Sequence, residues 1–327
     1  MLDYKNVIEK SKAYKVVDLD LSGSRLSHAY LFINADNNYL TSFAEVIAKK
    51  FINNNQTEDI IQKNNLRIDK RIHPDVNFYG ETKNVDVSVV SDIIELSNVS
   101  PFEADKKIFV ILNVQNMNES AQNKILKSIE EPPKNTFYIL CANSVSRILQ
   151  TILSRVKRIE LDELLVADIS SMLISKGVDE QKALIYASCA NGNGEFAEKL
   201  ATDDGFIDFF NQIVTCLYNI NGSRDVLNYA SIFTSKAVDK EEFFNIAMLL
   251  FRDIMMILTE TPEFVICKNV LAKLKVISST LNIEAVQTMI DVCLKEKEKL
   301  HFNVSQTAVV DDFLLKLAEV KVKCRRL

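Results

Sequence analysis

The residues between positions 34 and 41 stand where a phosphate-binding loop would do its chemistry. A buried strand is predicted up to Ile33, and a helix is predicted over 41–51. A nucleotide-binding ATPase places Gly-x-x-x-x-Gly-Lys-Thr between two such elements, because the glycine backbone approaches the phosphates and the lysine neutralises their charge. This sequence instead reads Asn34-Ala35-Asp36-Asn37-Asn38-Tyr39-Leu40-Thr41. The segment therefore has the position of such a loop without its residues.

The substitutions in this loop remove the groups that bind phosphate. Asn34 and Tyr39 occupy the two glycine positions, Leu40 replaces the lysine, and only Thr41 remains of the signature. Asparagine adopts left-handed backbone angles at modest cost, but Tyr39 adds bulk and Leu40 carries no charge. We expect this degenerate loop, which includes Asn37, to bind no ATP. On these residues alone, an alternative is that the strand and helix never formed a nucleotide-binding fold.

A second segment lacks the acidic residues of the same chemistry. In such ATPases a further strand ends in carboxylates that hold Mg²⁺ and activate water. The strand predicted over 107–112 ends instead in Leu112-Asn113-Val114-Gln115. Apolar and amide side chains cannot replace an anionic site. Two parts of one catalytic apparatus are missing from one scaffold, and this combination predicts a pseudo-ATPase.

A third segment, Ser154-Arg155-Val156, could act on a neighbouring molecule. In ring-shaped ATPases an arginine at this place reaches the nucleotide of the adjacent subunit, where it is worth roughly 10³ to 10⁵ in turnover. The simpler alternative is a solvated arginine at the start of a strand, flanked by Lys157 and Arg158.

The elements that must position these residues follow an alternating pattern. Up to about residue 160, short β-rich runs alternate with helical patterns, which predicts a parallel sheet flanked by helices. The strands are predicted over 29–33, 76–79, 107–112, 136–142 and 156–161, and helices over 42–53, 87–98 and 119–131. Beyond about 162 only helical periodicity remains. We predict three domains: an α/β core over 1–161, a small helical domain over 162–202 and a larger helical domain over 203–327.

Composition narrows the class of protein. The chain has 327 residues, 47% of them apolar, with only 7 glycines and 5 prolines, so a helix-rich globular protein is expected. The net charge of −5 gives no reason to expect tight binding of nucleic acid by the chain alone. Its 6 cysteines are widely spaced, which is typical of reduced thiols. The sequence shows neither the pattern of a signal peptide nor a long apolar segment, so we expect a cytoplasmic protein.

Several motifs together resemble one family. The chain is similar to the delta-prime family of bacterial DNA polymerase III clamp-loader subunits, within the AAA+ superfamily. The resemblance covers nearly the whole sequence. Its residues are Ser27-His28-Ala29-Tyr30-Leu31-Phe32, His73-Pro74-Asp75-Val76, Asn123-Lys124-Ile125-Leu126-Lys127-Ser128-Ile129-Glu130-Glu131-Pro132-Pro133, Thr151-Ile152-Leu153-Ser154-Arg155, Phe251-Arg252-Asp253-Ile254 and Leu300-His301-Phe302-Asn303-Val304.

The resemblance implies a specific role. It implies an AAA+ core, a helical lid and a C-terminal collar in a heteropentamer whose motor subunits use ATP to load a sliding clamp onto primed DNA. This chain would be the stator, which hydrolyses no ATP. Arg155, supported by Ser154, would be the arginine finger for a neighbouring motor subunit. The implied partners are the motor (tau/gamma) and delta subunits, with the clamp and primer-template DNA reached through the assembled DNA polymerase III holoenzyme.

Two departures and two alternatives accompany this resemblance. Many relatives carry a four-cysteine zinc module, but residues 51–72 contain no cysteine, so we expect no zinc. Val156 replaces a cysteine common after the Ser-Arg pair, with little expected effect. One alternative is an active ATPase with a divergent loop. The other is the clamp-opening delta subunit, against which the Ile-Leu-Ser-Arg run at 152–155 argues. His73-Pro74-Asp75-Val76 is expected to be a turn before a strand rather than a metal site.

Overall fold

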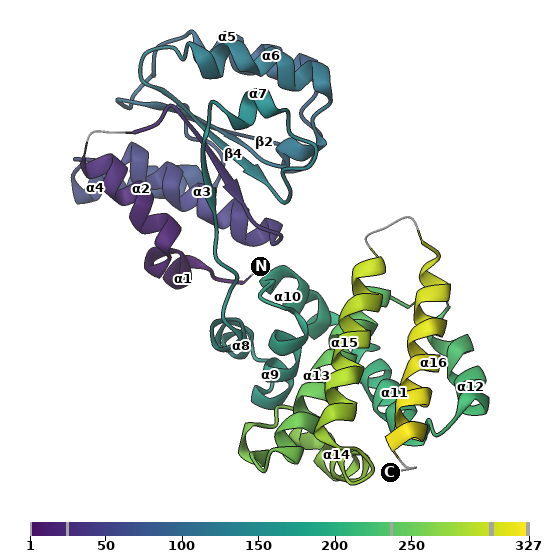
Figure 1. The fold of residues 1–327 in the computed structure, drawn as a ribbon. Coiled ribbons are helices and arrows are strands. Elements are labelled where there is room, and N and C mark those ends of the chain that lie inside the picture. Colours follow the sequence, from purple (N-terminus) through teal and green to yellow (C-terminus); the bar gives the residue numbers. More distant parts are fainter. Residues whose placement is uncertain (1, 24–25, 236–237, 301–303, 325–327) are drawn as a thin grey trace. The chain divides into compact units, whose positions relative to one another are not determined.

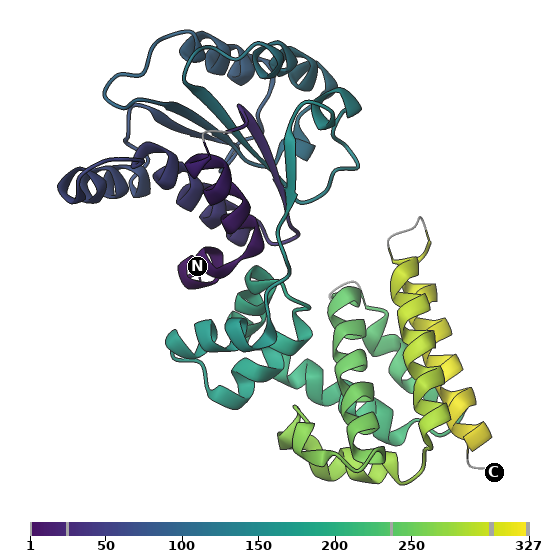
Figure 2. The same cartoon turned by 60° about the vertical axis from the view of Figure 1, so that its left-hand side comes forward.

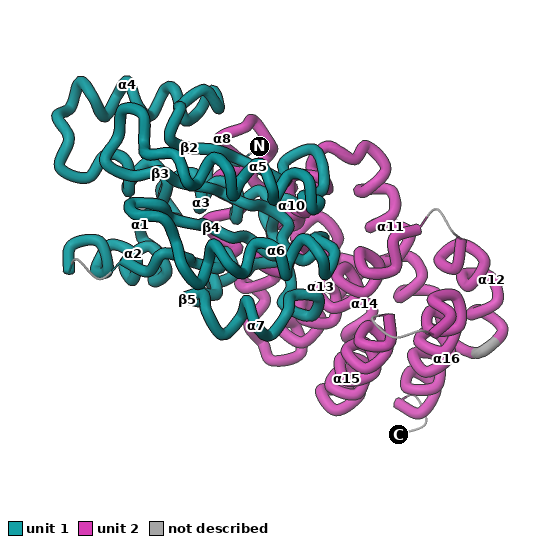
Figure 3. The backbone as a smooth tube through the Cα atoms, turned by 90° about the horizontal axis from the view of Figure 1, so that it is seen from above, with its two compact units in different colours: residues 1–164, 193–195 teal, residues 165–192, 196–327 magenta. Residues whose placement is uncertain are grey.

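The computed structural model describes residues 2–23, 26–235, 238–300 and 304–324. These residues form two compact units (Figure 3). Unit 1 comprises residues 1–164 together with 193–195, and unit 2 comprises 165–192 and 196–327. The separate helical domains predicted over 162–202 and 203–327 remain a prediction.

Unit 1 is built on a parallel sheet of five strands in the order β2-β3-β4-β1-β5 (Figure 1). The register pairs Leu31 with Leu140 and Tyr30 with Lys157, so β1 lies between β4 and β5. The predicted strands are confirmed, with ends that differ by a residue in two of them. The bounds are β1 (Ala29–Ile33), β2 (Val76–Tyr79), β3 (Lys107–Ile111), β4 (Thr136–Ala142) and β5 (Lys157–Glu160).

Helices cover both faces of this sheet (Figures 1 and 2). The helices α5 (Val87–Ser97) and α6 (Glu119–Glu130) pack side by side on one face. On the other face lie α2 (Lys12–Ser22) and α3 (Asn37–Ile52). The remaining helical segments of the unit are α1 (Lys5–Lys10), α4 (Glu58–Asp69), the 3₁₀ turn η1 (Val114–Asn116) and α7 (Gln150–Leu153).

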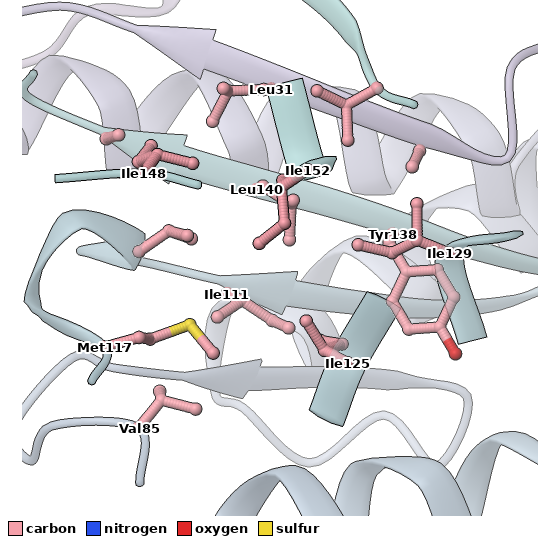
Figure 4. Close-up of a cluster of buried hydrophobic side chains, with 14 of the residues drawn as sticks. Leu31, Val85, Ile111, Met117, Ile125, Ile129, Tyr138, Leu140, Ile148 and Ile152 are labelled. Carbon is pink, nitrogen blue, oxygen red and sulfur yellow. The ribbon is translucent and has the colours of Figure 1, made fainter. Parts of the chain in front are cut away.

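The main core of unit 1 lies between the sheet and the layer of α5 and α6 (Figure 4). Leu31, Ile111 and Leu140 project from three strands toward Ile125 and Ile129 of α6. All seven residues of β4 and all five of β3 are buried, because helices exclude water from both faces. This explains why the central strands read as continuous apolar runs rather than as an alternation.

The start of α3 corrects the sequence prediction. A helix was expected from residue 41 or 42, yet α3 begins at Asn37, directly after Asp36. The Tyr39 backbone N–H donates to the Asp36 carboxylate at 2.8 Å, so Asp36 is the N-cap. Tyr39 and Leu40 are therefore helical residues and not loop residues. The helices α1, α2 and α4 were not predicted.

Within the ranges that the structure describes, all regular elements of unit 2 are helical. This agrees with the helical periodicity predicted beyond residue 162. Its α10 begins at Gly194, and residues 193–195 at that end group with unit 1. Nowhere in the described ranges is a helix both long and apolar enough to cross a membrane. The segments are α8 (Val166–Ser175), α9 (Glu180–Cys189), α10 (Gly194–Thr202), α11 (Phe206–Asn219), α12 (Ser223–Phe233), α13 (Lys240–Leu258), η2 (Pro262–Phe264), η3 (Lys268–Val270), α14 (Leu271–Ser278), α15 (Ile283–Lys299) and α16 (Gln306–Cys324).

Candidate functional site

The degenerate loop lies at the carboxyl edge of the sheet, between β1 and α3. Asn34 follows β1 and fixes the turn through its side chain. Its Nδ2 donates to the Leu161 carbonyl at 3.1 Å, and its Oδ1 accepts from the Asp36 N–H at 2.8 Å. An asparagine amide thus makes the turn here, where glycines would leave the backbone N–H groups open to phosphate.

Asp36 fills the end of this loop. Its side chain is fully buried, with an exposed fraction of 0%. Oδ1 accepts from the Tyr39 N–H, and Oδ2 accepts from the N–H groups of Gly194 at 2.8 Å and Glu195 at 3.1 Å. The Tyr4 hydroxyl donates to the same Oδ2 at 3.2 Å. A carboxylate of the chain itself therefore receives the N–H groups at this place.

The other predicted loop residues are also engaged. The Asn37 N–H donates to Glu195 Oε2 at 3.1 Å, and the Thr41 hydroxyl donates to the Asn37 carbonyl at 2.8 Å. Tyr39 and Leu40 are buried, and the Tyr39 ring lies 5.5 Å from the Tyr4 ring between centroids. Tyr39 thus belongs to an aromatic contact inside unit 1.

The second degenerate segment, after β3, serves the backbone rather than a metal. Leu112 and Gln115 are buried, and Asn113 has a left-handed backbone with φ of 56°. The Asn113 Nδ2 donates to the Gly80 carbonyl at 3.1 Å, and Gln115 Oε1 accepts from the Asn143 N–H at 3.4 Å. The amide groups hold neighbouring loops together at the same carboxyl edge of the sheet.

Arg155 lies at the opposite, amino edge, between α7 and β5. Its Nη1 donates to the Ser154 hydroxyl at 3.0 Å and to the Thr151 carbonyl at 3.1 Å. Its Nε lies 2.5 Å from Glu130 Oε1, and the two side chains are 41% and 42% exposed. Since β5 runs parallel to β1, the length of the strands separates Arg155 from the degenerate loop of its own chain. The arginine is thus exposed and is oriented by its contacts at the edge opposite that loop.

The motifs that first suggested a family have structural roles here. In His73-Pro74-Asp75-Val76, Asp75 accepts from the N–H groups of Phe102, Glu103 and Ala104 at 2.6, 2.8 and 2.9 Å. The turn predicted before β2 is confirmed. Burial lowers the pKa of His73, which is the behaviour of a packed neutral histidine.

In the C-terminal motif, Asp253 accepts from the Ile266 and Cys267 N–H groups at 3.1 and 2.7 Å. It therefore ties α13 to a loop that follows it. Of the other C-terminal motif, His301, Phe302 and Asn303 lie outside the described residues.

Sequence reasoning missed four residues that shape the sites: Tyr4, Asp36, Glu130 and Glu195. Asp36 could have been found, because aspartate three residues before a tyrosine that opens an apolar periodic run is an N-cap signal. Glu195 lies 158 residues from Asn37, and no local pattern connects the two. Across the described ranges, no group of three or more His, Cys, Asp or Glu side chains is arranged to hold a metal ion. That the chain carries no zinc and no ATP remains a prediction.

Comparison with known proteins shows similarity to subunits of DNA polymerase III. Residues 9–164 match the family model described as DNA polymerase III, delta subunit. The chain is 24% identical to the delta′ subunit of DNA polymerase III from Bacillus subtilis, over 94% of this chain and 96% of that protein. It is 24% identical to the gamma subunit from Buchnera aphidicola of Acyrthosiphon pisum, over 80% and 74%. It is 23% identical to the tau subunit of B. subtilis, over 91% and 58%.

Solved structures show more distant likeness. A gamma subunit-related protein from Thermotoga maritima is 16% identical, with a TM-score of 0.38 over 97% of this chain and 98% of that one. The B. subtilis clamp loader delta protein is 12% identical, with a TM-score of 0.33 over 93% and 99%.

Residues 9–164 thus match a DNA polymerase III delta-subunit model, and the chain as a whole is similar to the DNA polymerase III subunits named delta′, gamma and tau. Within that group the sequence resembles the delta-prime subunit. The alignment with the B. subtilis delta′ protein over nearly the whole of both chains confirms this resemblance.

Proposed function

We propose that this chain is the stator of a clamp loader, a subunit that hydrolyses no ATP and completes the active site of a neighbouring motor subunit. The observation that carries the proposal is Arg155, which is exposed and held by Ser154 at the amino edge of the sheet. The degenerate loop at the other edge is filled by the chain's own side chains. The chain would therefore donate the Arg155 guanidinium to a neighbour, while its own degenerate loop leaves no place for a nucleotide.

The arginine would act by stabilising charge on the phosphoryl group as it is transferred in the neighbour's site. Before assembly its partner is Glu130, and both side chains are about two-fifths exposed. An exposed ion pair contributes only about 0–1 kcal/mol, so replacing Glu130 with a phosphate oxygen costs little. The Ser154 and Thr151 contacts can persist, because they use Nη1 alone. They would keep the guanidinium plane fixed during the exchange.

The proposed partners follow from the relatives. The chain would assemble with motor (tau/gamma) and delta subunits and would reach the sliding clamp and primer-template DNA only within that assembly. Its net charge of −5 favours this over direct DNA binding by the chain alone.

The decisive experiment compares variants of this chain in a clamp loader reconstituted with motor and delta subunits, clamp and primed DNA. Arg155→Ala should lower ATP turnover at the motor site it serves by roughly 10³ or more. Arg158→Ala is the matched control, because Arg158 is an exposed arginine three residues further on. If Arg155→Ala assembles normally and turnover is unchanged, Arg155 is an ordinary surface residue and the proposal fails.

A further inference from the structure

We propose that the Asp36 carboxylate is a built-in anion that occupies the phosphate position at the N-terminus of α3. This inference deepens the proposal that the chain carries no nucleotide and rests on it. It explains what the degenerate loop holds instead: a negative charge supplied by the chain.

The first step concerns the donors. In a phosphate-binding loop, backbone N–H groups at the start of the helix after β1 point at the phosphates. Here the corresponding N–H groups of Asn37 and Tyr39 donate to carboxylate oxygens of Glu195 and Asp36, at 3.1 and 2.8 Å. Both donors are thus already satisfied by anions.

The second step separates Asp36 from an ordinary N-cap. A capping side chain satisfies N–H groups of its own helix, which Oδ1 does through Tyr39. The other oxygen, Oδ2, accepts from the Gly194 and Glu195 N–H groups and from the Tyr4 hydroxyl. It receives donors from segments 32 and 158 residues away in sequence. A cap for α3 alone needs none of these.

The third step concerns charge. Gly194 and Glu195 are the first two residues of α10, so the N-termini of α3 and α10 meet at one carboxylate. The positive end of the α3 dipole favours a negative charge there. The exchange is reciprocal, because Asp36 accepts from the first turn of α10 and Glu195 accepts from the first turn of α3. Asp36 is fully buried. A buried carboxylate is tolerated when charge-assisted hydrogen bonds such as these satisfy it.

The fourth step concerns space. A Cβ at Gly194 would lie 2.9 Å from the Tyr4 hydroxyl and 3.2 Å from Asp36 Oδ2. Glycine at position 194 therefore lets the backbone approach the carboxylate closely. A side chain at position 194 would disturb the hydrogen bonds to Asp36 Oδ2.

The test uses melting temperatures of the full chain, without nucleotide or partner subunits. Asp36→Ala removes the carboxylate and leaves room for formate, a small anion of the same chemistry. Asp36→Asn keeps the volume but not the charge. We expect Asp36→Ala to lower the melting temperature by about 5–10 °C. Sodium formate should then raise it by several degrees more than sodium chloride at equal ionic strength. Formate should have no such effect on the wild type or on Asp36→Asn.

Asp36→Asn decides the question even if Asp36→Ala does not fold. Asparagine and aspartate are about equally good N-caps, so an ordinary cap predicts a melting temperature close to that of the wild type. A built-in anion predicts a clear decrease, because the amide NH₂ cannot accept from Gly194 and Glu195. A wild-type value for Asp36→Asn, or a response of Asp36→Ala to formate no larger than to chloride, overturns the inference. Neither result bears on Arg155, which the reconstituted complex tests separately.

Discussion

At the scale of single residues, three buried aspartates hold loops in place by accepting backbone N–H groups. Asp36, Asp75 and Asp253 all have an exposed fraction of 0%. Each accepts two or more N–H groups, and part of them comes from segments distant in sequence. Charge-assisted hydrogen bonds of this kind are stronger than neutral ones, so each carboxylate fixes a loop firmly.

The Asp75 carboxylate should be essential for the order of the loop at 102–104. Asp75→Asn leaves one oxygen to accept three N–H groups, so we expect unfolding to be easier by about 2–4 kcal/mol. Hydrogen exchange at the amides of Phe102, Glu103 and Ala104 should accelerate at least tenfold. Asp105→Asn, on the exposed part of the same loop, is the control and should change neither. Unchanged exchange in Asp75→Asn would show that the loop is held by other contacts.

A buried glutamate in unit 2 should make stability depend on pH. Burial, with the nearby carboxylates of Asp239 and Asp203, raises the pKa of Glu242 from 4.5 to about 7, and Lys199 opposes the shift. The folded protein therefore binds this proton more tightly than the unfolded chain. Protonation of Glu242 therefore adds to the free energy of unfolding at low pH. This stabilisation is lost as the pH rises from about 4.5 through 7.

The measurement is the stability of the full chain between pH 5 and pH 8, compared with that of Glu242→Gln. The wild type should lose about 1–3 kcal/mol relative to this variant as the pH rises. Parallel pH profiles for the two proteins would contradict the prediction.

At the scale of elements, the sequence predicted whether a segment is a helix or a strand better than it predicted where that element begins and ends. The three inner strands, β1, β3 and β4, were the most predictable, because burial on both faces leaves runs of apolar, β-branched and aromatic residues. The start of α3 was not predictable, because Asn37, Asn38 and Tyr39 are weak helix formers whose first turn depends on Asp36 and on Glu195, far along the chain. The absence of phosphate-binding residues from the loop could be read directly from the sequence, whereas the hydrogen bonds of Asp36 and Glu195 depend on tertiary contacts.

The start of α10 should tolerate no side chain larger than hydrogen at its first residue. Gly194→Ala places a Cβ 2.9 Å from the Tyr4 hydroxyl, so we expect a loss of about 1–3 kcal/mol in the free energy of unfolding. Gly222→Ala is the control, because nothing lies within 4 Å of a Cβ there and its backbone is extended. Thermal unfolding of both variants tests this. Equal stability would mean that Tyr4 can move aside without loss.

At the scale of the whole molecule, the filled loop and the net charge lead to two predictions for the chain alone. The chain alone should show no tight Mg²⁺-dependent ATP binding and no strong DNA binding, because its loop is filled and its net charge is −5. Calorimetric titration with ATP and binding of primed DNA at several salt concentrations test these two expectations. Tight ATP binding would instead favour an active ATPase with a divergent loop. Strong, salt-sensitive DNA binding would assign the lone chain a direct role on DNA.

The parallel sheet of unit 1 also gives the subunit a direction. Its strands all run one way, so its two edges are chemically unlike, with Arg155 before β5 at one edge and the filled loop after β1 at the other. If Arg155 serves a neighbouring subunit as proposed, that subunit must lie at the amino edge, and the filled loop sets no such requirement at the carboxyl edge. The polarity of a single sheet would then decide on which side of this chain the served subunit sits.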